Sequence, residues 1–369
     1  YKYKNKLQNK NMKKKFIISL LLLMIVSVIN SYYGRYYLDS YSNYFIKEII
    51  WFVVGLIIIY SLSKVNIGFI LDKSLYLYLI GIVLLIVTLI WGVNVNGSTS
   101  WIKIFGFSFQ PSEFMKIFLI LYLRYITVNY NLSDFKYVIV TMIITLIPSL
   151  LVFLEPDTGP VISYLVIFIT FLIMKKLDKW YYIFGVSVIL ICIVSFIYLY
   201  SFNNDLFIDI FGTNFFYRMD RLTNFMNREG YQIETAIKSI SLSGLFGIKK
   251  RVYFPEAETD FAITLLIANF GLVGFIIYLI LFSIFLFFLD KLCNDKFILK
   301  PCINFIVIQA GINILMNISL FPIVGITYPL LSYGGSSCIS ILLLIGIIYN
   351  MDNMDYSYNH HSNYNRKKV

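Results

Sequence analysis

The sequence predicts an all-α integral membrane protein with about ten transmembrane helices and one long extracytoplasmic loop. Hydrophobic residues make up 59% of the 369 residues and charged residues only 14%, whereas soluble domains carry about 25% charged residues. The chain contains repeated apolar runs close to the roughly 20 residues that a helix needs to cross the hydrocarbon layer. Each run is expected to be helical, because unpaired backbone groups are too costly in lipid.

The apolar runs divide the chain into five parts. A basic segment, 1–15, precedes seven spans within 16–201, a long outer loop covers 202–260, three spans follow within 261–350, and a disordered tail covers 351–369. The expected spans lie near 16–33, 46–62, 75–93, 112–128, 137–154, 158–174, 181–201, 261–289, 301–320 and 327–350.

The first span has the basic start and apolar stretch of a secretion signal. No small-residue cleavage motif follows it and more spans come later, so it is read as a transmembrane helix. Met12 is a candidate initiator.

The distribution of Lys and Arg predicts which side each loop faces. The N-terminal segment carries seven lysines, and the segments 63–74, 124–136, 175–180 and 290–300 and the tail add two or three basic residues each. The short loops on the other side carry only Arg35, Lys47 and Lys103. Basic residues collect on the cytoplasmic side, so both termini are expected there. The net charge of +11 is explained in this way, without a nucleic-acid partner.

Cysteine and histidine usage excludes several kinds of site. The four cysteines form no CxxC pair, so the spacing supports neither a zinc site nor a disulfide framework. The only histidines are His360 and His361 in the polar tail, so a Ser-His-Asp site or a His-rich metal site elsewhere is excluded.

Ionisable groups at membrane depth are candidates for function. Glu113 and Lys116, in QPSEFMK, are three apart and are expected to pair on one helix face; they either serve function or only neutralise each other for insertion. Asp157, in EPDTG, either lines an outer cavity or is a helix N-cap in an exposed turn.

A second group of candidates lies in the long loop. Glu256, Glu258 and Asp260 fall at the start of the eighth span, where Asp260 at the water–lipid interface would suit a general base; the alternative is an acidic helix start that favours the dipole. Arg218 and Arg221 share a face if helical and could grip a diphosphate; the alternative is contact with anionic lipid head groups.

The run LSYGGSS, at 331–337, enters the last expected span. Its small residues favour close helix packing.

In this order, the motifs QPSEFMK, EPDTG, GYQIETAIKSISLSGLFG, PEAETDF and LFPIVGITYPLLSYGGSS resemble the SEDS family (shape, elongation, division and sporulation proteins), typified by RodA and FtsW. The resemblance reaches from about residue 90 to 345. It implies a GT-C-like helical fold and a peptidoglycan glycosyltransferase of the bacterial plasma membrane that polymerises lipid II.

The resemblance also implies roles for single residues. Asp260 falls on the family's catalytic aspartate. Glu113 and Lys116 fall on the charged residues of the family's QPSE motif, where they are expected to contact substrate, and Asp157 falls on its cavity-lining aspartate. Further expected substrate contacts are Arg218, Arg221 and Glu256. The family acts with a class B penicillin-binding protein, a transpeptidase. A divalent cation, magnesium or manganese, is a candidate cofactor.

The chain departs from the family pattern in places. Ala268 and Asn269 stand where paired glutamates are usual, Glu258 stands where a histidine is usual, and Thr99 and Ser100 replace a basic residue. These departures favour a specialised, sporulation-type or divergent member. Two alternative functions stay open: a flippase or transporter for the lipid-linked precursor, and a non-catalytic scaffold of a cell-wall synthase.

Overall fold

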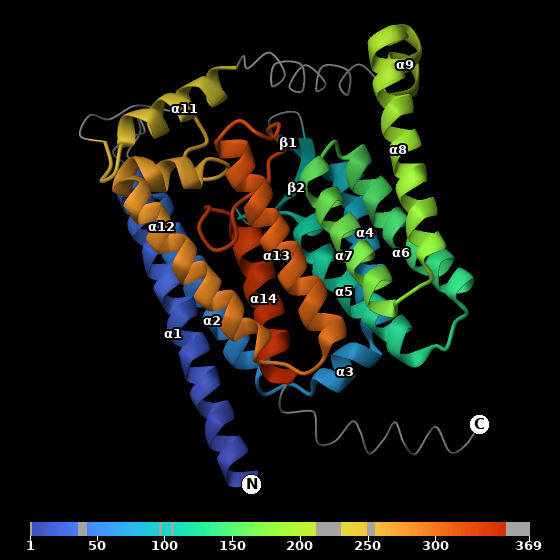
Figure 1. Ribbon diagram of the computed structural model, residues 1–369, viewed down its shortest axis with the longest axis horizontal. Coiled ribbons are helices and arrows are strands. Elements are labelled where there is room, and N and C mark those ends of the chain that lie inside the picture. The colour runs from blue at the N-terminus through green and yellow to red at the C-terminus, as the bar shows by residue number, and fades with distance from the viewer. Residues whose placement is uncertain are drawn as a thin grey trace.

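Long helices run side by side through the molecule (Figure 1). The computed structural model describes residues 2–35, 43–95, 98–104, 107–211, 230–248 and 255–351. The helices that fall on the ten expected spans are α1 (Lys2–Gly34), α2 (Tyr44–Leu62), α4 (Ser74–Trp91), α5 (Pro111–Asn129), α6 (Asp134–Leu154), α7 (Thr158–Lys175), α8 (Lys179–Phe202), α12 (Ala262–Asp290), α13 (Lys296–Asn317) and α14 (Gly335–Met351). Within the described ranges, seven of them are long and apolar enough to cross a membrane, and α5, α8 and α14 occupy the other expected spans. The chain is therefore an all-α membrane protein, as predicted.

The predicted start of the last span, at residue 327, is wrong. Residues 318–334 form turns and irregular chain, and α14 begins only at Gly335. Pro322 and Pro329 have no backbone N–H to donate to a helix, and Gly325 adopts a φ of +67°. The apolar residues 327–334 therefore belong to irregular chain and not to the last helix.

Short elements occupy the expected loops. They are α3 (Ile67–Asp72) between α2 and α4, and α9 (Asn204–Phe211) and α11 (Tyr231–Ser243) within the long loop. A small antiparallel sheet that the sequence analysis did not predict joins α4 to α5, with β1 (Val93–Val95), β2 (Ser98–Ile104) and β3 (Phe107–Phe109) in the order β1-β2-β3. The sheet lies at the same end of the molecule as α11 (Figure 1).

Helix α5 lies at the centre of the bundle, packed against α4, α6, α7, α13 and α14. It carries three charged side chains, Glu113, Lys116 and Arg124, and all three are buried. The Arg124 guanidinium lies 2.8 Å from the Asp295 carboxylate at the start of α13. The three charged side chains of α5 are thus shielded from lipid by neighbouring helices, which is where charged groups in a membrane protein are tolerated.

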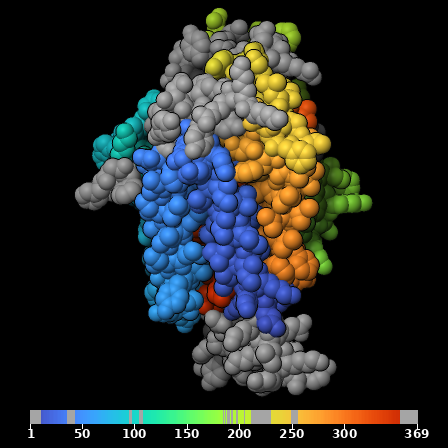
Figure 2. Space-filling model, turned by 90° about the vertical axis from the view of Figure 1, so that its left-hand side faces the viewer, coloured from blue at the N-terminus to red at the C-terminus, as the bar shows by residue number. Residues whose placement is uncertain are grey.

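Helix α12 is broken at Gly271, whose φ of +68° and ψ of −170° are not helical. The amides of Leu272 and Val273 bond instead to the carbonyls of Gly244 and Leu245, at 3.1 and 3.2 Å. A Cβ on Gly271 would overlap the backbone of Leu245 and Phe246. The loop after α11 is therefore wedged into the break, and α11 lies across the start of α12 (Figures 1 and 2).

Helix α6 contains Pro148, which cannot donate to the carbonyl of Ile144 one turn earlier. The Tyr78 hydroxyl of α4 donates to that carbonyl at 2.9 Å. A neighbouring helix thus supplies the missing hydrogen bond, as lipid-embedded backbone requires.

The prediction that the small residues of 331–337 allow close packing is confirmed for Gly335. A Cβ there would lie 2.7 Å from the Trp51 ring of α2. Further along α14, a Cβ on Gly346 would lie 3.2 Å from the Ile59 backbone. Helices α2 and α14 therefore approach closely along their length.

The start of α1 and the end of α14 lie at one end of the molecule. The Lys13 ammonium lies 4.9 Å from the centre of the Tyr349 ring, and the Phe16 ring packs against the same tyrosine. The sheet and α11 lie at the opposite end (Figure 1). This arrangement agrees with the expected even number of spans.

Candidate active site

A tight turn precedes α12 and carries Asp260. The amides of Thr259 and Phe261 both donate to the Glu256 carbonyl, at 3.2 and 3.0 Å. The Thr259 hydroxyl donates to the Glu256 carboxylate at 2.7 Å, and Glu256 itself adopts a φ of +53°. Asp260 is partly exposed, Glu256 is exposed and Glu258 is buried. The alternative of an acidic helix start is wrong, because α12 begins at Ala262 and its first turn contains no acidic residue.

Two neighbouring elements fix the backbone of this turn. The Tyr333 amide, in the segment 318–334, donates to the Glu258 carbonyl at 2.7 Å. Two amide side chains of α13, Asn313 and Asn317, donate to the Asp260 carbonyl at 2.9 and 3.0 Å. The position of Asp260 is therefore set by α13 and by the segment before α14.

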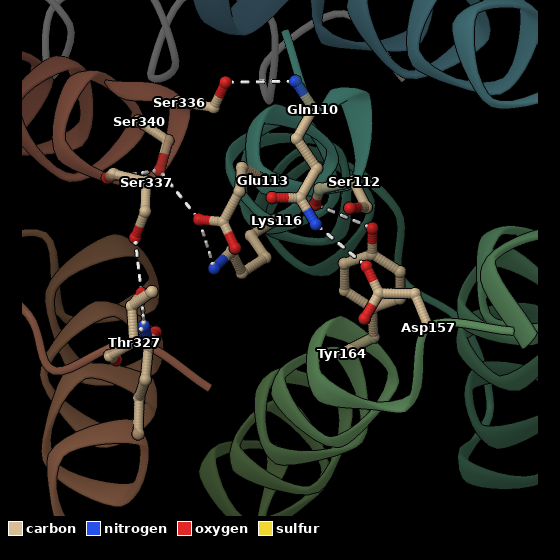
Figure 3. Close-up of polar contacts among 11 residues, drawn as sticks. Gln110, Ser112, Glu113, Lys116, Asp157, Tyr164, Thr327, Ser336, Ser337 and Ser340 are labelled. Atoms are coloured by element: carbon tan, nitrogen blue, oxygen red, sulfur yellow. Dashed lines mark hydrogen bonds and ion pairs between the residues drawn. The ribbon is translucent and has the colours of Figure 1, made fainter. Parts of the chain in front are cut away.

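A second cluster lies at the start of α5 (Figure 3). The Lys116 ammonium bonds to the Glu113 carboxylate at 2.7 Å, and both side chains are buried. The predicted pair is thus confirmed. The Ser340 hydroxyl of α14 donates to the same carboxylate at 3.3 Å, and the ammonium lies 5.6 Å from the centre of the Phe305 ring of α13. The cluster joins three helices at the middle of the bundle.

Asp157 faces this cluster from the start of α7. It holds the N-cap position, but its side chain makes no capping hydrogen bond; instead its carboxylate accepts from the Gln110 amide at 2.8 Å (Figure 3). Burial raises the pKa of Asp157 to about 6, and hydrogen bonds with Ser100 and Gln110 oppose that rise. The alternative that the Asp157 side chain caps α7 is therefore wrong.

Glu155 belongs to the same turn, between α6 and α7. It is completely buried, and neither carboxylate oxygen has a hydrogen-bond partner in the described part of the chain. Its carbonyl accepts from the Thr99 amide and the Ser98 hydroxyl of β2, at 3.2 and 2.9 Å. Burial raises the pKa of Glu155 to about 8, with a smaller contribution from the charge of Asp157. The raised pKa favours the protonated, neutral form of the Glu155 carboxyl group near pH 7.

The segment 318–334 and the start of α14 link the two regions. The Gln309 side chain of α13 donates to the Thr327 carbonyl at 2.9 Å. The Thr327 and Ser337 hydroxyls lie 3.0 Å apart, and the Ser340 hydroxyl, which reaches Glu113, also donates to the Ser337 carbonyl at 2.9 Å. Hydrogen bonds therefore run from α13, which holds the Asp260 turn, to the ion pair on α5 (Figure 3).

The sequence analysis missed several of these residues. Gln309, Asn313 and Asn317 recur every four residues in an apolar helix, a spacing that places amides on one face and could have drawn attention. Glu48, in the second expected span, is buried and accepts from Ser27 and Ser31 of α1. An isolated glutamate in a span carries the same signal as Glu113.

Arg218 and Arg221, the expected diphosphate contacts, lie outside the described residues.

Comparison with known proteins decides the family. The sequence model of the FtsW, RodA and SpoVE family, described as "Cell cycle protein", matches residues 10–357. The chain belongs to this family.

Curated family members align along nearly all of the chain. A probable peptidoglycan glycosyltransferase FtsW of Coxiella burnetii is 29% identical over 90% of this chain and 92% of its own length. Stage V sporulation protein E of Bacillus subtilis is also 29% identical, over 91% of this chain and 95% of its own length.

Solved structures of the family share the fold. A chain in a structure titled "Structural coordination of polymerization and crosslinking by a peptidoglycan synthase complex" has a TM-score of 0.78, 19% identity, and coverage of 93% of this chain and 98% of that one. The rod shape determining protein RodA of Thermus thermophilus has a TM-score of 0.67 at 20% identity, covering 93% of this chain and 97% of its own.

The departures from the FtsW, RodA and SpoVE pattern have visible structural partners. Asn269 donates to the Asn30 side chain and carbonyl of α1, at 2.8 and 3.2 Å, so it ties α12 to α1. Ala268 is completely buried and its carbonyl accepts from the Ile248 amide at 2.8 Å. In this member Asn269 ties α12 to α1, and the Ala268 backbone holds the loop after α11 against α12.

Proposed function

We propose that this chain is a peptidoglycan glycosyltransferase that polymerises lipid II at the outer face of a bacterial plasma membrane. One observation carries the proposal: a partly exposed aspartate, Asp260, lies in a turn whose backbone is bound by α13 and by the segment 318–334. The turn directly precedes α12, whose first residues lie beside α11 at the end of the bundle away from the start of α1 (Figure 1). The names of the aligned relatives support it.

The proposed reaction is a displacement at a sugar carbon. The Asp260 carboxylate takes the proton of the acceptor's sugar 4-hydroxyl as general base. The hydroxyl oxygen forms a bond to the donor's anomeric carbon as the bond from that carbon to the lipid diphosphate breaks, and the diphosphate leaves with the electron pair. Single displacement inverts the configuration, so an α-linked donor gives a β-linked product.

The remaining groups have proposed supporting roles. Glu113, Lys116 and Asp157 form the polar interior next to which the saccharide would bind, and Glu256 is an exposed contact beside the base. The departing diphosphate needs positive charge, for which Arg218 and Arg221 are our candidates.

The expected magnesium or manganese ion has no ligand set in the described ranges, where no three His, Cys, Asp or Glu side chains group so as to hold a metal ion.

The proposed setting places both termini in the cytoplasm. The lysine-rich start of α1 lies at the same end as the end of α14, and basic residues favour the cytoplasmic side. The proposed partner is a class B penicillin-binding protein, because a neighbour in fold comes from a complex that couples polymerisation to crosslinking.

The test is a lipid II polymerisation assay on the purified full chain, with and without its transpeptidase. Asp260→Asn keeps the size of the side chain but cannot accept the proton, and general-base catalysis contributes about 10²- to 10⁴-fold. We expect glycan formation to fall by at least about 100-fold. Asp209→Asn, an exposed aspartate of α9, is the matched control and should polymerise at the wild-type rate. Polymerisation by folded Asp260→Asn at the wild-type rate would reject the assignment.

A flippase is the second candidate, favoured by the buried ion pair of Glu113 and Lys116 in the centre of the bundle. Liposomes containing fluorescent lipid II separate the two. Translocation that persists in Asp260→Asn and stops in Glu113→Gln would favour the flippase. A chain that binds its transpeptidase without polymerising or moving lipid II would be the scaffold.

A further inference from the structure

Three amide side chains form a row on α13. Gln309, Asn313 and Asn317 are four residues apart, so they stack on one face of the helix. They are 4%, 0% and 1% exposed. Burying a polar group in a spanning helix costs free energy unless the group is hydrogen-bonded. The hydrogen-bond partners of these amides therefore indicate their role.

Asn313 joins two segments that are far apart in the sequence. Its amide donates to the Asp260 carbonyl at 2.9 Å and to the Ile326 carbonyl at 2.7 Å. Both of its N–H groups are therefore used to hold irregular chain, one segment before α12 and one after α13. Helix packing alone would not require a side chain with two donors here.

Asn317 has a donor and an acceptor role. Its amide donates to the same Asp260 carbonyl at 3.0 Å. Its side-chain oxygen accepts from the Thr264 amide and hydroxyl, at 2.9 and 2.7 Å. The N-cap residue of α12, Phe261, has no side chain that can cap, so Asn317 satisfies one of the free amides of the first turn from another helix.

These bonds act on the residue that carries the proposed base. The Asp260 carbonyl receives two N–H groups, and the Glu258 carbonyl receives the Tyr333 amide at 2.7 Å. The backbone is thus bound at Asp260 and again two residues earlier. A misplacement of about 1 Å at a reacting group can reduce the rate by about 100-fold.

We propose that Asn313 and Asn317 are positioning residues, which hold Asp260 at the place where it meets the acceptor hydroxyl. This inference rests on the proposed function, since it takes Asp260 as the base. Neither asparagine touches the reacting atoms; each acts through the Asp260 backbone. Because the two amides share one acceptor oxygen, the remaining amide keeps part of the hold on the turn when the other is removed.

The experiment measures kcat and KM for lipid II polymerisation in Asn313→Leu, Asn317→Leu and the double variant. Leucine has a similar shape and keeps α13 helical. We expect each single change to lower kcat by about 10-fold and the double change to lower it by more than the product of the two. KM should stay within about threefold of wild type, since no substrate contact is removed.

The matched control is Asn304→Leu. Asn304 lies on the same helix, and its amide donates to the Thr170 hydroxyl of α7 at 3.1 Å instead of to the Asp260 turn. The Asn304→Leu variant loses a comparable hydrogen bond from a side-chain amide, so it reports the effect of weaker helix packing alone. We expect its kcat to equal that of wild type, even if its unfolding temperature falls.

Several outcomes would overturn the inference. One is a folded double variant whose kcat equals that of wild type. Another is a fall in kcat no larger than that of Asn304→Leu. A third is a rise in KM with kcat unchanged. If the double variant does not fold, the single variants decide in the same way. Wild-type activity in Asp260→Asn instead rejects the proposed function, so the two failures are distinguishable.

Discussion

Glu155 shows how a single residue can make stability depend on pH. Its carboxyl group is completely buried between α6 and α7, and burial raises its pKa to about 8. The unfolded chain has a glutamate pKa of about 4.3. The folded state therefore binds the proton more tightly, and the stability from this group is fully present below about pH 4 and is lost as the pH rises to about 8.

We expect Glu155→Gln to weaken this pH dependence. The neutral amide has no charge to desolvate, so the variant should lose less stability than wild type between about pH 5 and pH 8, by an amount on the order of a few kcal/mol. The measurement is the thermal unfolding midpoint of the detergent-purified protein across that range. Glu234→Gln, on an exposed glutamate of α11, is the control and should follow wild type. If the unfolding midpoint depends on pH equally in Glu155→Gln and in wild type, the prediction is contradicted.

At the scale of elements, helices were easier to predict than interruptions of helices. Apolar runs predicted the helices because a membrane allows little else. The same runs predicted a gap between spans at 321–326, but not that irregular chain reaches 334 or that α12 breaks at Gly271, because the backbone bonds of both segments go to distant parts of the chain. Leu272 bonds to Gly244 and Tyr333 bonds to Glu258, and such pairs are set by tertiary contact.

The candidate site divides in the same way. The pairing of Glu113 with Lys116 could be predicted because side chains three residues apart on a helix lie close together. The bond between Gln110 and Asp157, and the two amides on the Asp260 carbonyl, join helices that are distant in sequence. Spacing within one helix says nothing about those partners.

The break in α12 leads to a prediction about two glycines. Gly271→Ala places a Cβ at a φ of +68° and against the Leu245 backbone, so the loop after α11 must move. We expect the free energy of unfolding to fall by more than about 1 kcal/mol from backbone strain alone. Displacement of the loop should lower it further. The measurement is the unfolding midpoint in detergent.

Gly311→Ala, in α13, is the matched control. A Cβ on Gly311 meets no atom within 4 Å, and alanine favours a helix over glycine by about 1 kcal/mol. This variant should be as stable as wild type or more so. If both changes have the same effect, the wedge at Gly271 is not what shapes α12.

At the scale of the whole molecule, the two ends of the bundle differ in composition. One end has the lysine-rich start of α1, and the other has the sheet, α11 and the Asp260 turn (Figure 1). Helices α1, α2 and α12 form a continuous side wall between them (Figure 2). The proposed reaction requires that the second end faces the exterior.

Cysteine labelling tests this orientation. In a chain without its native cysteines, we expect a cysteine at Glu234, in α11, to react with an impermeant maleimide in intact cells. A cysteine at Ser133, in the exposed link between α5 and α6, should react only after the membrane is permeabilised. The reverse pattern would place the Asp260 turn in the cytoplasm and contradict the proposed function.

The central position of α5 has a consequence for how the protein is made. Arg124 of α5 pairs with Asp295, which is 171 residues later in the chain. When α5 leaves the ribosome, that partner has not been synthesised, and α5 is surrounded only by α1 to α4. Its guanidinium must therefore wait in water or among lipid head groups until α13 arrives. The contacts of α5 with α13 and α14 can form only after these last helices have been made.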